Sequence, residues 1–396
     1  MKRYQLYLGV GVASLWLVTG LFSVVGYAGT VMPEGGAQPL VRIAIKQNAS
    51  VGEISIRGTY EVSDPVTGEV LGSGRRMPRV QLVPVRDGIQ LGNDFYGRER
   101  IRITTRKDIT VYGTKNDKRY RENMDIVRNA DGNLLLINQV NLEDYIRGVL
   151  YHEVSHRWPM EALKTQAVAA RTYAMYRKKI RKHKEFDVTN DTFSQVYGGR
   201  SAERYRTNLA VKKTRGEILS FNGEVLSAYY HSTCGGVTLS SNDVWQEEIL
   251  IPLRGAKCNY CYNSPHYKWK RNFHLQDIQE KLNAEGYQAG TIKDIRVDKR
   301  TKEGLVQILK ITGRNGEVVK VSGKEFRGIL GPNLIKSSRY RIKMKGYYCD
   351  IIGRGWGHGV GMCQWGTRGM AKQRYNYKTI LNYYYPGAKI VRLENL

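Results

Sequence analysis

Carboxylate side chains are scarce in this sequence. Its 396 residues contain 36 Asp and Glu against 63 Lys and Arg, which gives a formal net charge of +27. This imbalance predicts a polyanionic partner, namely nucleic acid, an acidic membrane surface or an anionic cell-wall polymer. Because the basic residues are spread along the chain and not gathered in one tail, a solvated basic surface explains the charge equally well.

Two further features are absent from the sequence. It has no internal repeat and no low-complexity segment, so we expect one or two domains with a large core. The glycine-rich run 353–366 lacks the Gly-Lys-Ser/Thr ending of a phosphate-binding loop, and no long parallel βαβ pattern surrounds it. These absences exclude a nucleotide-binding loop in that run.

Charge is also absent between residues 6 and 28, and Lys2 and Arg3 precede this apolar run. At about 1.5 Å per residue, a helix of this length crosses the roughly 30 Å hydrocarbon core of a membrane. The basic residues would hold a short tail, 1–5, in the cytoplasm. We therefore expect a single-pass anchor in the cell membrane, with a signal peptide cleaved after Ala28 as the alternative. Both readings export the bulk of the chain, which argues against nucleic acid and favours an envelope polymer.

The remainder divides by its sequence pattern. Residues 30–38 contain Pro and Gly, as is typical of a linker. Between 39 and 133, short alternating apolar and polar runs separated by turn signals predict a small β-rich accessory domain. Helical and strand patterns mix over 134–396, where we expect the catalytic domain. The fold class predicted for the whole chain is α+β.

Helices are expected at four places in the second domain. Asn141, with an acidic residue three positions on, is typical of an N-cap, and helical apolar spacing continues to about Glu153. A second helix is expected from Pro159 to about Lys182, with the proline in its first turn. Two shorter helices are expected over 275–285 and 379–384.

Candidate catalytic and binding residues lie on the first two helices. Glu153 follows His152, and an apolar wall there would raise the pKa of the glutamate and suit it to general acid catalysis. A lone glutamate is more often a surface residue. Lys164 and Arg171 share one helical face with the small Ala167 between them, which leaves room for a ligand. Two solvated cations on an outer face are an equally good interpretation.

Polar groups also gather in two later stretches. Asp191, Gln195 and Tyr197 lie in a loop rich in groups that bond hydroxyls, as sugar-binding loops are, although an ordinary turn has the same composition. In the glycine-rich run, alternate glycines indicate close approach of the backbone to a ligand or to a neighbouring strand. His358 and Gln364 are the polar contacts expected there.

The spacing of the cysteines predicts a metal site. Cys258 and Cys261 form a CxxC pair, with His266 five residues on and Cys234 upstream. Three thiolates and one imidazole suffice for a closed tetrahedral zinc site, for which His231 is a substitute ligand. A disulfide is the alternative, because export would permit one. We favour one structural zinc ion, with the two remaining cysteines as buried thiols.

Five of these stretches resemble the stage II sporulation protein D / amidase-enhancer family of bacterial envelope proteins. The matching segments are Asn141–Met175, Ser194–Gly199, His231–Gly236, Ser264–His266 and Gly353–Gly369. The resemblance implies a lytic transglycosylase that acts on peptidoglycan, with a preference for glycan strands without stem peptides. It also implies that zinc occurs in some members and not in others.

The resemblance also implies roles for individual residues. Glu153 would protonate the glycosidic oxygen and then deprotonate the C6 hydroxyl of N-acetylmuramic acid, which attacks its own anomeric carbon to give a 1,6-anhydro end. One carboxylate then suffices and the chemistry needs no cofactor, whereas a two-carboxylate glycosidase needs a partner at about 5–9.5 Å, for which Asp191 is the candidate. Lys164, Gln166 and Arg171 would bind the substrate.

The partners implied by the resemblance are peptidoglycan strands, the membrane, a cell-wall amidase and a membrane scaffold protein, but no nucleic acid. The β-rich domain lies mostly outside the matching segments, which leaves both a sporulation role in engulfment and a vegetative role open. Two other functions remain. An amidase enhancer would bind the wall and stimulate a separate autolysin without using Glu153, and a structural wall anchor would need only the basic surface.

Overall fold

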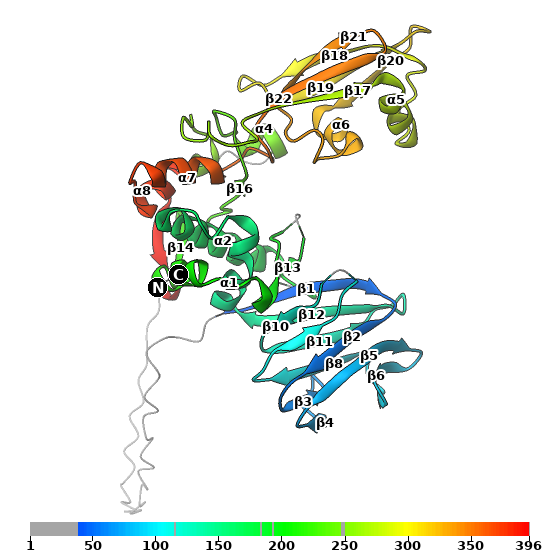
Figure 1. Cartoon of the computed structure of the whole chain (residues 1–396), viewed down its shortest axis with the longest axis vertical. Helices are drawn as coiled ribbons and strands as arrows, with labels where there is room; N and C mark the ends of the chain where they lie inside the picture. Colours follow the sequence, from blue (N-terminus) through cyan, green and yellow to red (C-terminus); the bar gives the residue numbers. More distant parts are fainter. Residues whose placement is uncertain (1–38, 115, 183, 192–193, 247–249, 396) are drawn as a thin grey trace, which may run out of the picture. The chain divides into compact units, whose positions relative to one another are not determined.

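The computed structural model describes residues 39–395 apart from 115, 183, 192–193 and 247–249 (Figure 1). The predicted cytoplasmic tail, anchor or signal peptide and linker all lie outside these residues. Within the described part of the chain, no helix is long and apolar enough to cross a membrane. This finding contradicts the predicted location as a single-pass membrane protein.

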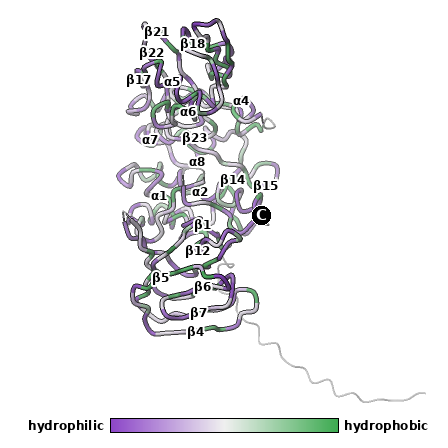
Figure 2. The backbone as a smooth tube through the Cα atoms, turned by 90° about the vertical axis from the view of Figure 1, so that its right-hand side faces the viewer, coloured by the Kyte–Doolittle hydropathy of each residue, from purple (hydrophilic) through white to green (hydrophobic). Residues whose placement is uncertain are grey.

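The N-terminal part of the described chain is built from strands, as its alternating sequence predicts. Along these strands, hydrophobic and hydrophilic residues follow one another in short stretches (Figure 2). One sheet has seven strands, in the order β13 (Val188–Thr189), β1 (Leu40–Ala49), β12 (Leu134–Asn141), β11 (Asn123–Arg128), β8 (Arg100–Thr105), β3 (Tyr60–Ser63) and β4 (Val70–Gly74). A second has six strands, in the order β10 (Lys118–Tyr120), β9 (Ile109–Val111), β2 (Gly52–Ile56), β5 (Met77–Val85), β6 (Gly88–Leu91) and β7 (Asp94–Tyr96).

The two sheets share one buried core. Ile43 and Ile101 of the first sheet and Ile54 of the second belong to the same hydrophobic cluster. This cluster continues into the helices that follow, through Tyr145 and Ala167. β12 pairs antiparallel with both β1 and β11, so the domain boundary predicted at 133/134 falls between two paired strands of one sheet.

The central part of the chain is mainly helical. Its helices are α1 (Leu142–Glu153), α2 (Met160–Ile180), η1 (Gly199–Ala202), α3 (Tyr205–Lys213), α4 (Ser241–Trp245), η2 (Ile251–Leu253), α7 (Gln364–Lys372), α8 (Tyr377–Tyr384) and η3 (Leu393–Asn395). Two small sheets accompany them, one ordered β15 (Glu224–Val225), β14 (Glu217–Phe221) and β24 (Lys389–Arg392), the other made of β16 (Tyr230–His231) and β23 (Met362–Cys363). A second hydrophobic core joins α2, α7 and α8 through Val168, Met370 and Ile380.

A third region with its own core lies between β16 and β23 in the sequence. It consists of the sheet β17 (Lys268–His274), β22 (Tyr348–Arg354), β21 (Tyr340–Lys345), the sheet β18 (Ile292–Arg300), β19 (Val306–Gly313), β20 (Val318–Ser322), and the helices α5 (Leu275–Ala284) and α6 (Gly323–Leu330). Ile278, Leu309 and Phe326 are fully buried in its core. The mixture of strands and helices confirms the predicted α+β class.

The four predicted helices are all present. Asn141 caps α1 as expected, because its Oδ1 accepts a hydrogen bond from the Asp144 N–H at 3.0 Å. Pro159 occupies the N-cap position of α2, one residue earlier than expected for a first-turn proline. Sequence reasoning did not anticipate α3, α6 or α7.

Candidate functional site

The candidate site is centred on Glu153, the last residue of α1. The helix ends there because Val154 is extended, with φ −142° and ψ 148°. Gln364, the first residue of α7, donates a hydrogen bond from its Nε2 to Glu153 Oε2 at 3.2 Å across 211 residues of sequence. The structure thus places Gln364, which was predicted to bind substrate, against the proposed acid.

The surroundings of Glu153 favour the protonated carboxyl. Burial raises the pKa of Glu153 to about 7, although hydrogen bonds from the Gln364 and Tyr230 side chains and from the backbone of Val196 oppose this rise. The carboxyl also stands at the C-terminus of a helix, where the helix dipole disfavours negative charge. A carboxyl in this state can donate a proton at neutral pH.

Tyr230 is a site residue that sequence reasoning missed. It is held in place by Gln195, whose Nε2 donates to the Tyr230 hydroxyl at 2.8 Å and whose Oε1 accepts from the Tyr145 hydroxyl at 3.0 Å. His358 contacts the backbone of Tyr230, because the His358 Nε2 lies 2.9 Å from the Tyr230 carbonyl oxygen. The one available signal was the position of Tyr230 directly before the matching segment that begins at His231.

Gln195 and Tyr197 were predicted to bind substrate, but both are buried and hydrogen-bond to residues of the protein instead. Gln195 is 1% exposed and Tyr197 is 1% exposed. The Tyr197 hydroxyl donates to Asn138 Oδ1 at 2.8 Å, which ties the loop to β12. Asp191 accepts a hydrogen bond from Thr189 Oγ1 at 2.8 Å within its own loop.

The residues predicted on α2 are not brought together in one binding groove. Arg171 is fully buried and forms a two-pronged ion pair with Glu143, with both nitrogen–oxygen distances at 2.9 Å. Lys164 is only partly buried, and its Nζ lies 2.6 Å from Glu161 Oε1. Gln166 is 1% exposed, and neither atom of its amide has a partner among the described residues. Of the two predicted cations, Lys164 alone remains within reach of a ligand.

The glycine-rich run approaches a neighbouring strand, one of the two possibilities its sequence left open. β16 pairs in parallel with β23. A Cβ on Gly361, whose φ is 67°, would lie 2.1 Å from the Tyr229 carbonyl oxygen. A Cβ on Gly355, whose φ is 82°, would lie 2.5 Å from the Thr233 carbonyl oxygen. Only glycine fits at these positions, and the close packing fixes Gln364 at the start of α7.

An aromatic pair next to the acid was also missed. Trp158 and Trp365 meet edge to face with ring centroids 5.6 Å apart. The Arg368 guanidinium lies over both rings, 5.8 Å and 4.8 Å from their centroids. Trp365 directly follows Gln364, so the pair borders the candidate site. Aromatic faces with a polar neighbour suit the stacking of sugar rings.

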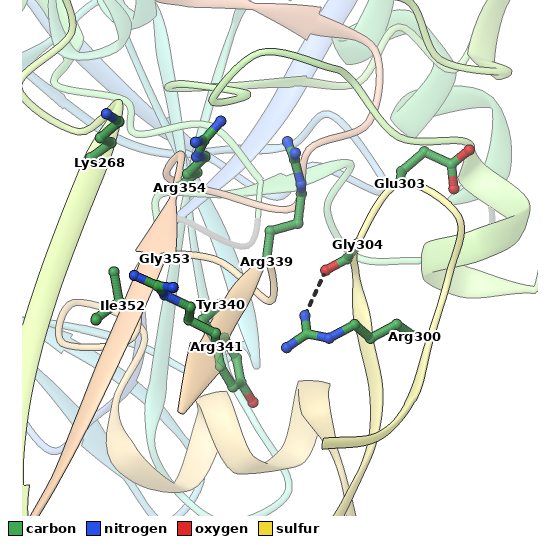
Figure 3. A pocket seen from close by; sticks show the side chains of 10 residues that line it. All are labelled: Lys268, Arg300, Glu303, Gly304, Arg339, Tyr340, Arg341, Ile352, Gly353 and Arg354. Carbon is green, nitrogen blue, oxygen red and sulfur yellow. Dashed lines mark hydrogen bonds between the residues drawn. The ribbon is translucent and has the colours of Figure 1, made fainter. Parts of the chain in front are cut away.

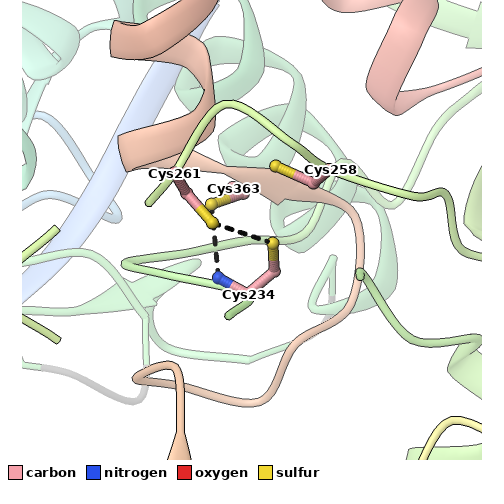
Figure 4. Close-up of side chains that lie close together, drawn as sticks. All are labelled: Cys234, Cys258, Cys261 and Cys363. Carbon is pink, nitrogen blue, oxygen red and sulfur yellow. Dashed lines mark hydrogen bonds between the residues drawn. The ribbon is translucent and has the colours of Figure 1, made fainter. Parts of the chain in front are cut away.

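A separate cluster of four cysteines could hold a metal ion. The sulfur atoms of Cys234, Cys258, Cys261 and Cys363 all lie within 4.8 Å of one another, and all four residues are buried (Figure 4). Tetrahedral zinc with Zn–S bonds of about 2.3 Å requires such spacing. The N–H groups of Cys234 and Gly366 point to Cys363 Sγ at 3.2 Å and 3.3 Å, as suits a thiolate.

The fourth member of this cluster differs from the one that the sequence suggested. Cys363 joins the three other cysteines, whereas His266 lies elsewhere, with its Nδ1 2.9 Å from Lys336 Nζ and its ring against Trp356. The alternative of a disulfide is not adopted, because all five cysteines are free in the structure. The CxxC spacing identified the site, but a ligand about a hundred residues away on β23 gave no local signal.

Comparison with known proteins gives two family matches. Residues 130–221 match the family model described as Stage II sporulation protein, and residues 238–361 match a Domain of unknown function (DUF8618). The first match contains Glu153, and the second covers the region with its own core between β16 and β23.

Three relatives span much of the chain. An uncharacterised protein of Brachyspira hyodysenteriae is 34% identical over 355 residues, covering 89% of this chain and 93% of the relative. Stage II sporulation protein D of Bacillus amyloliquefaciens is 30% identical over 274 residues, covering 65% and 76%. The amidase enhancer of Bacillus subtilis is 28% identical over 294 residues, covering 62% of this chain but 40% of that longer protein.

Proposed function

This chain belongs to the Stage II sporulation protein D family, and we propose that it is a lytic transglycosylase that cleaves the glycan strands of peptidoglycan. The observation that carries the proposal is the Glu153 carboxyl, whose pKa burial raises to about 7 beside Gln364. Peptide-free strands are the preferred substrate and 1,6-anhydro-N-acetylmuramic acid ends are the product. A role in sporulation would follow from the family.

The proposed reaction uses one carboxyl twice. The protonated Glu153 gives its proton to the glycosidic oxygen as the bond to the anomeric carbon breaks. The resulting carboxylate then takes the proton of the C6 hydroxyl of the same N-acetylmuramic acid residue. The C6 oxygen bonds to the anomeric carbon and closes the 1,6-anhydro ring. The substrate supplies the nucleophile, so no second carboxylate is needed. In the described residues, no other carboxylate contributes to the pKa of Glu153.

The neighbours of Glu153 have distinct roles in this scheme. Gln364 and Tyr230 donate hydrogen bonds to the carboxyl and so stabilise the carboxylate formed after the first proton transfer. Gln195 and His358 are positioning residues that act through Tyr230. Trp158 and Trp365 would stack on sugar rings.

An amidase enhancer is the second candidate function, because a protein of that name is 28% identical over 294 residues. In that case the chain would bind peptidoglycan and stimulate a separate cell-wall amidase. The buried Glu153 carboxyl beside Gln364 supports the first proposal, because perturbed pKa values cluster at catalytic sites.

The product of the reaction separates these functions. Purified protein is incubated with intact and with peptide-free glycan strands, and soluble fragments are identified by mass spectrometry. Anhydro-ended fragments support the transglycosylase. Reducing ends would indicate hydrolysis, and binding without cleavage would favour the enhancer.

The pH dependence of cleavage is expected to follow Glu153. Only the protonated carboxyl can act first, so activity should fall as the pH rises through about 7. Gln364→Leu removes a donor that favours the ionised form and should move this fall to higher pH. Initial rates between pH 5 and pH 9 check this, with the exposed Gln373→Leu in the C-cap position of the same helix as control. An unchanged profile in Gln364→Leu would show that another group governs the reaction.

We also infer that the four-cysteine cluster holds structural zinc, since four buried thiols with this spacing fit a closed tetrahedral site. It would brace the start of α7, because Cys363 directly precedes Gln364. In the proposed reaction, the side chains around Glu153 carry out the proton transfers.

Loss of one cluster cysteine is expected to remove the metal. Cys258→Ser should lower the zinc content from about one per chain to near zero and the free energy of unfolding by about 4 kcal/mol or more. Elemental analysis and chemical denaturation measure the two quantities. Cys349→Ser is the matched control, because Cys349 is also buried but lies in a different core. Equal zinc in both variants would contradict the assignment.

A further inference from the structure

A cavity of about 480 Å³ lies at one end of the β17-β22-β21 sheet (Figure 3). It belongs to the region that matches a domain of unknown function. Five of its lining side chains are cationic and one is acidic: Lys268, Arg300, Arg339, Arg341 and Arg354, with Glu303. Nothing in the proposed glycan cleavage uses this cavity.

The five cations have no carboxylate partner within the described ranges of the chain. Glu303 does not neutralise them. Instead it lies beside Asp243, where burial and the Glu303 carboxylate raise the pKa of Asp243. The same sheet does neutralise cations elsewhere, since Asp350 lies 3.1 Å from Lys270 and 2.8 Å from Lys345. The cavity therefore concentrates positive charge that the protein leaves unmatched.

This arrangement carries a cost in stability. Lys268 and Arg354 face each other in register across β17 and β22, and like charges in that position repel. Burial lowers the pKa of Arg339, and the charge of Arg354 adds to this, whereas the nearby Cys234 opposes it. Among the residues that the structure describes, the Arg339 guanidinium donates to two neutral groups, the carbonyl oxygens of Cys234 at 2.9 Å and Val237 at 3.4 Å. A half-buried guanidinium without a carboxylate partner is typical of sites where an anion binds.

A buried polar group on the wall also lacks a partner. Tyr340 lines the cavity and is 3% exposed, and its hydroxyl has no hydrogen-bond partner among the residues described. Arg300 lies close enough for its charge to act on this hydroxyl, and its own Nη1 donates to the Gly304 carbonyl oxygen at 3.1 Å. A bound oxyanion would give both groups an acceptor.

We propose that this cavity binds phosphate groups of an anionic polymer. Guanidinium groups match phosphate oxygens in two-pronged hydrogen bonds. A single carboxylate would leave most of the five cations unmatched, whereas a phosphodiester chain brings a charge with every repeat. The cavity is also of the size that holds an organic ligand and not a lone ion. The cavity lies outside the proposed glycan-cleaving site, and phosphate polymers would be the ligand class of the domain of unknown function.

The test measures binding to the full-length protein by isothermal titration calorimetry. The probes are poly(glycerol phosphate), glycerol 3-phosphate and polyglutamate, together with phosphatidylglycerol vesicles. The double variant Arg341→Gln/Arg354→Gln removes two exposed cavity cations, and Lys310→Gln/Lys343→Gln removes two exposed cations of the same region outside it. The polymer is expected to bind the cavity variant at least about tenfold more weakly, and the control less than about twofold. Glycerol 3-phosphate should bind more weakly than the polymer and be lost in the same variant.

Three results would overturn the proposal. Equal weakening in both double variants would mean that the polymer follows the diffuse basic surface. Equal affinity for polyglutamate would mean that phosphate is not selected. Binding to vesicles but not to the polymer would assign the cavity to a lipid surface. These binding measurements do not depend on glycan cleavage. A failure of the phosphate-binding proposal would therefore leave the proposed enzymatic function unaffected.

Discussion

Glu153→Gln is expected to lower the rate of glycan cleavage by about 10³-fold. The amide keeps the shape of the side chain and a hydrogen bond to Gln364, but it can neither give nor take the proton. Anhydro-ended fragments quantified by mass spectrometry measure the loss. Glu285→Gln is the matched control, because Glu285 also stands at the C-terminus of a helix but is exposed.

Stability measurements separate this loss from unfolding. Burial raises the pKa of Glu153 from the ordinary 4.5 to about 7, so the folded protein binds more protons than the unfolded chain between these values. The parent therefore loses stability as the pH rises from 4.5 to 7, and the loss is complete above 7. At pH 8 the neutral Glu153→Gln should be at least as stable as the parent. A folded Glu153→Gln that cleaves at the parental rate would place the acid elsewhere.

Arg171→Met is expected to lower the free energy of unfolding by about 3–5 kcal/mol. The Arg171 and Glu143 side chains are 0% and 4% exposed, so the substitution leaves a buried carboxylate without its counter-charge. Arg171 also donates to the Glu217 carbonyl oxygen at 3.0 Å, and Glu143 accepts from the Gly216 N–H at 3.1 Å. The pair thus ties α1 and α2 to the start of β14. Urea denaturation gives the stability directly.

Two further variants make this measurement specific. Lys179→Met breaks an ion pair with Glu224 whose side chains are 55% and 68% exposed, and it should cost at most about 1 kcal/mol. Adding Glu143→Leu to Arg171→Met removes the unmatched carboxylate and should recover much of the loss. If Arg171→Met kept its stability and lost glycan binding, Arg171 would be a ligand of the substrate after all.

Local signals in the sequence predicted the elements well where one residue decides the structure. Asn141 placed the start of α1, and Pro159 placed the start of α2 to within one residue. The sequence did not predict α7, because Gly366 and Gly369 are poor helix formers. Both glycines lie in the helix because their neighbours leave no room for a side chain. A Cβ on Gly366 would lie 1.9 Å from the Tyr384 hydroxyl, and one on Gly369 would lie 2.0 Å from the Tyr260 carbonyl oxygen. Close tertiary packing of this kind has no local pattern.

The candidate site was predictable in part. The sequence identified Glu153 and Gln364 as candidate residues but did not predict their contact. It also could not show which side chains are buried, because burial depends on how the helices pack. Lys164 and Arg171 share a helical face by spacing alone, yet Arg171 lies inside and Lys164 near the surface. In the same way, the spacing in the sequence could not show that Cys363 on β23 completes the cysteine cluster.

The contact between Glu153 and Gln364 also bears on how the protein folds. It closes a loop of 211 residues, and β16 must meet β23 before α7 can present its amide. Contacts between residues so distant in the chain form slowly, because the entropy of loop closure is lost before the contact contributes. The carboxyl therefore gains its partner only when nearly the whole chain has been synthesised and folded. A nascent or truncated chain therefore lacks this partner of Glu153 until α7 has formed and docked.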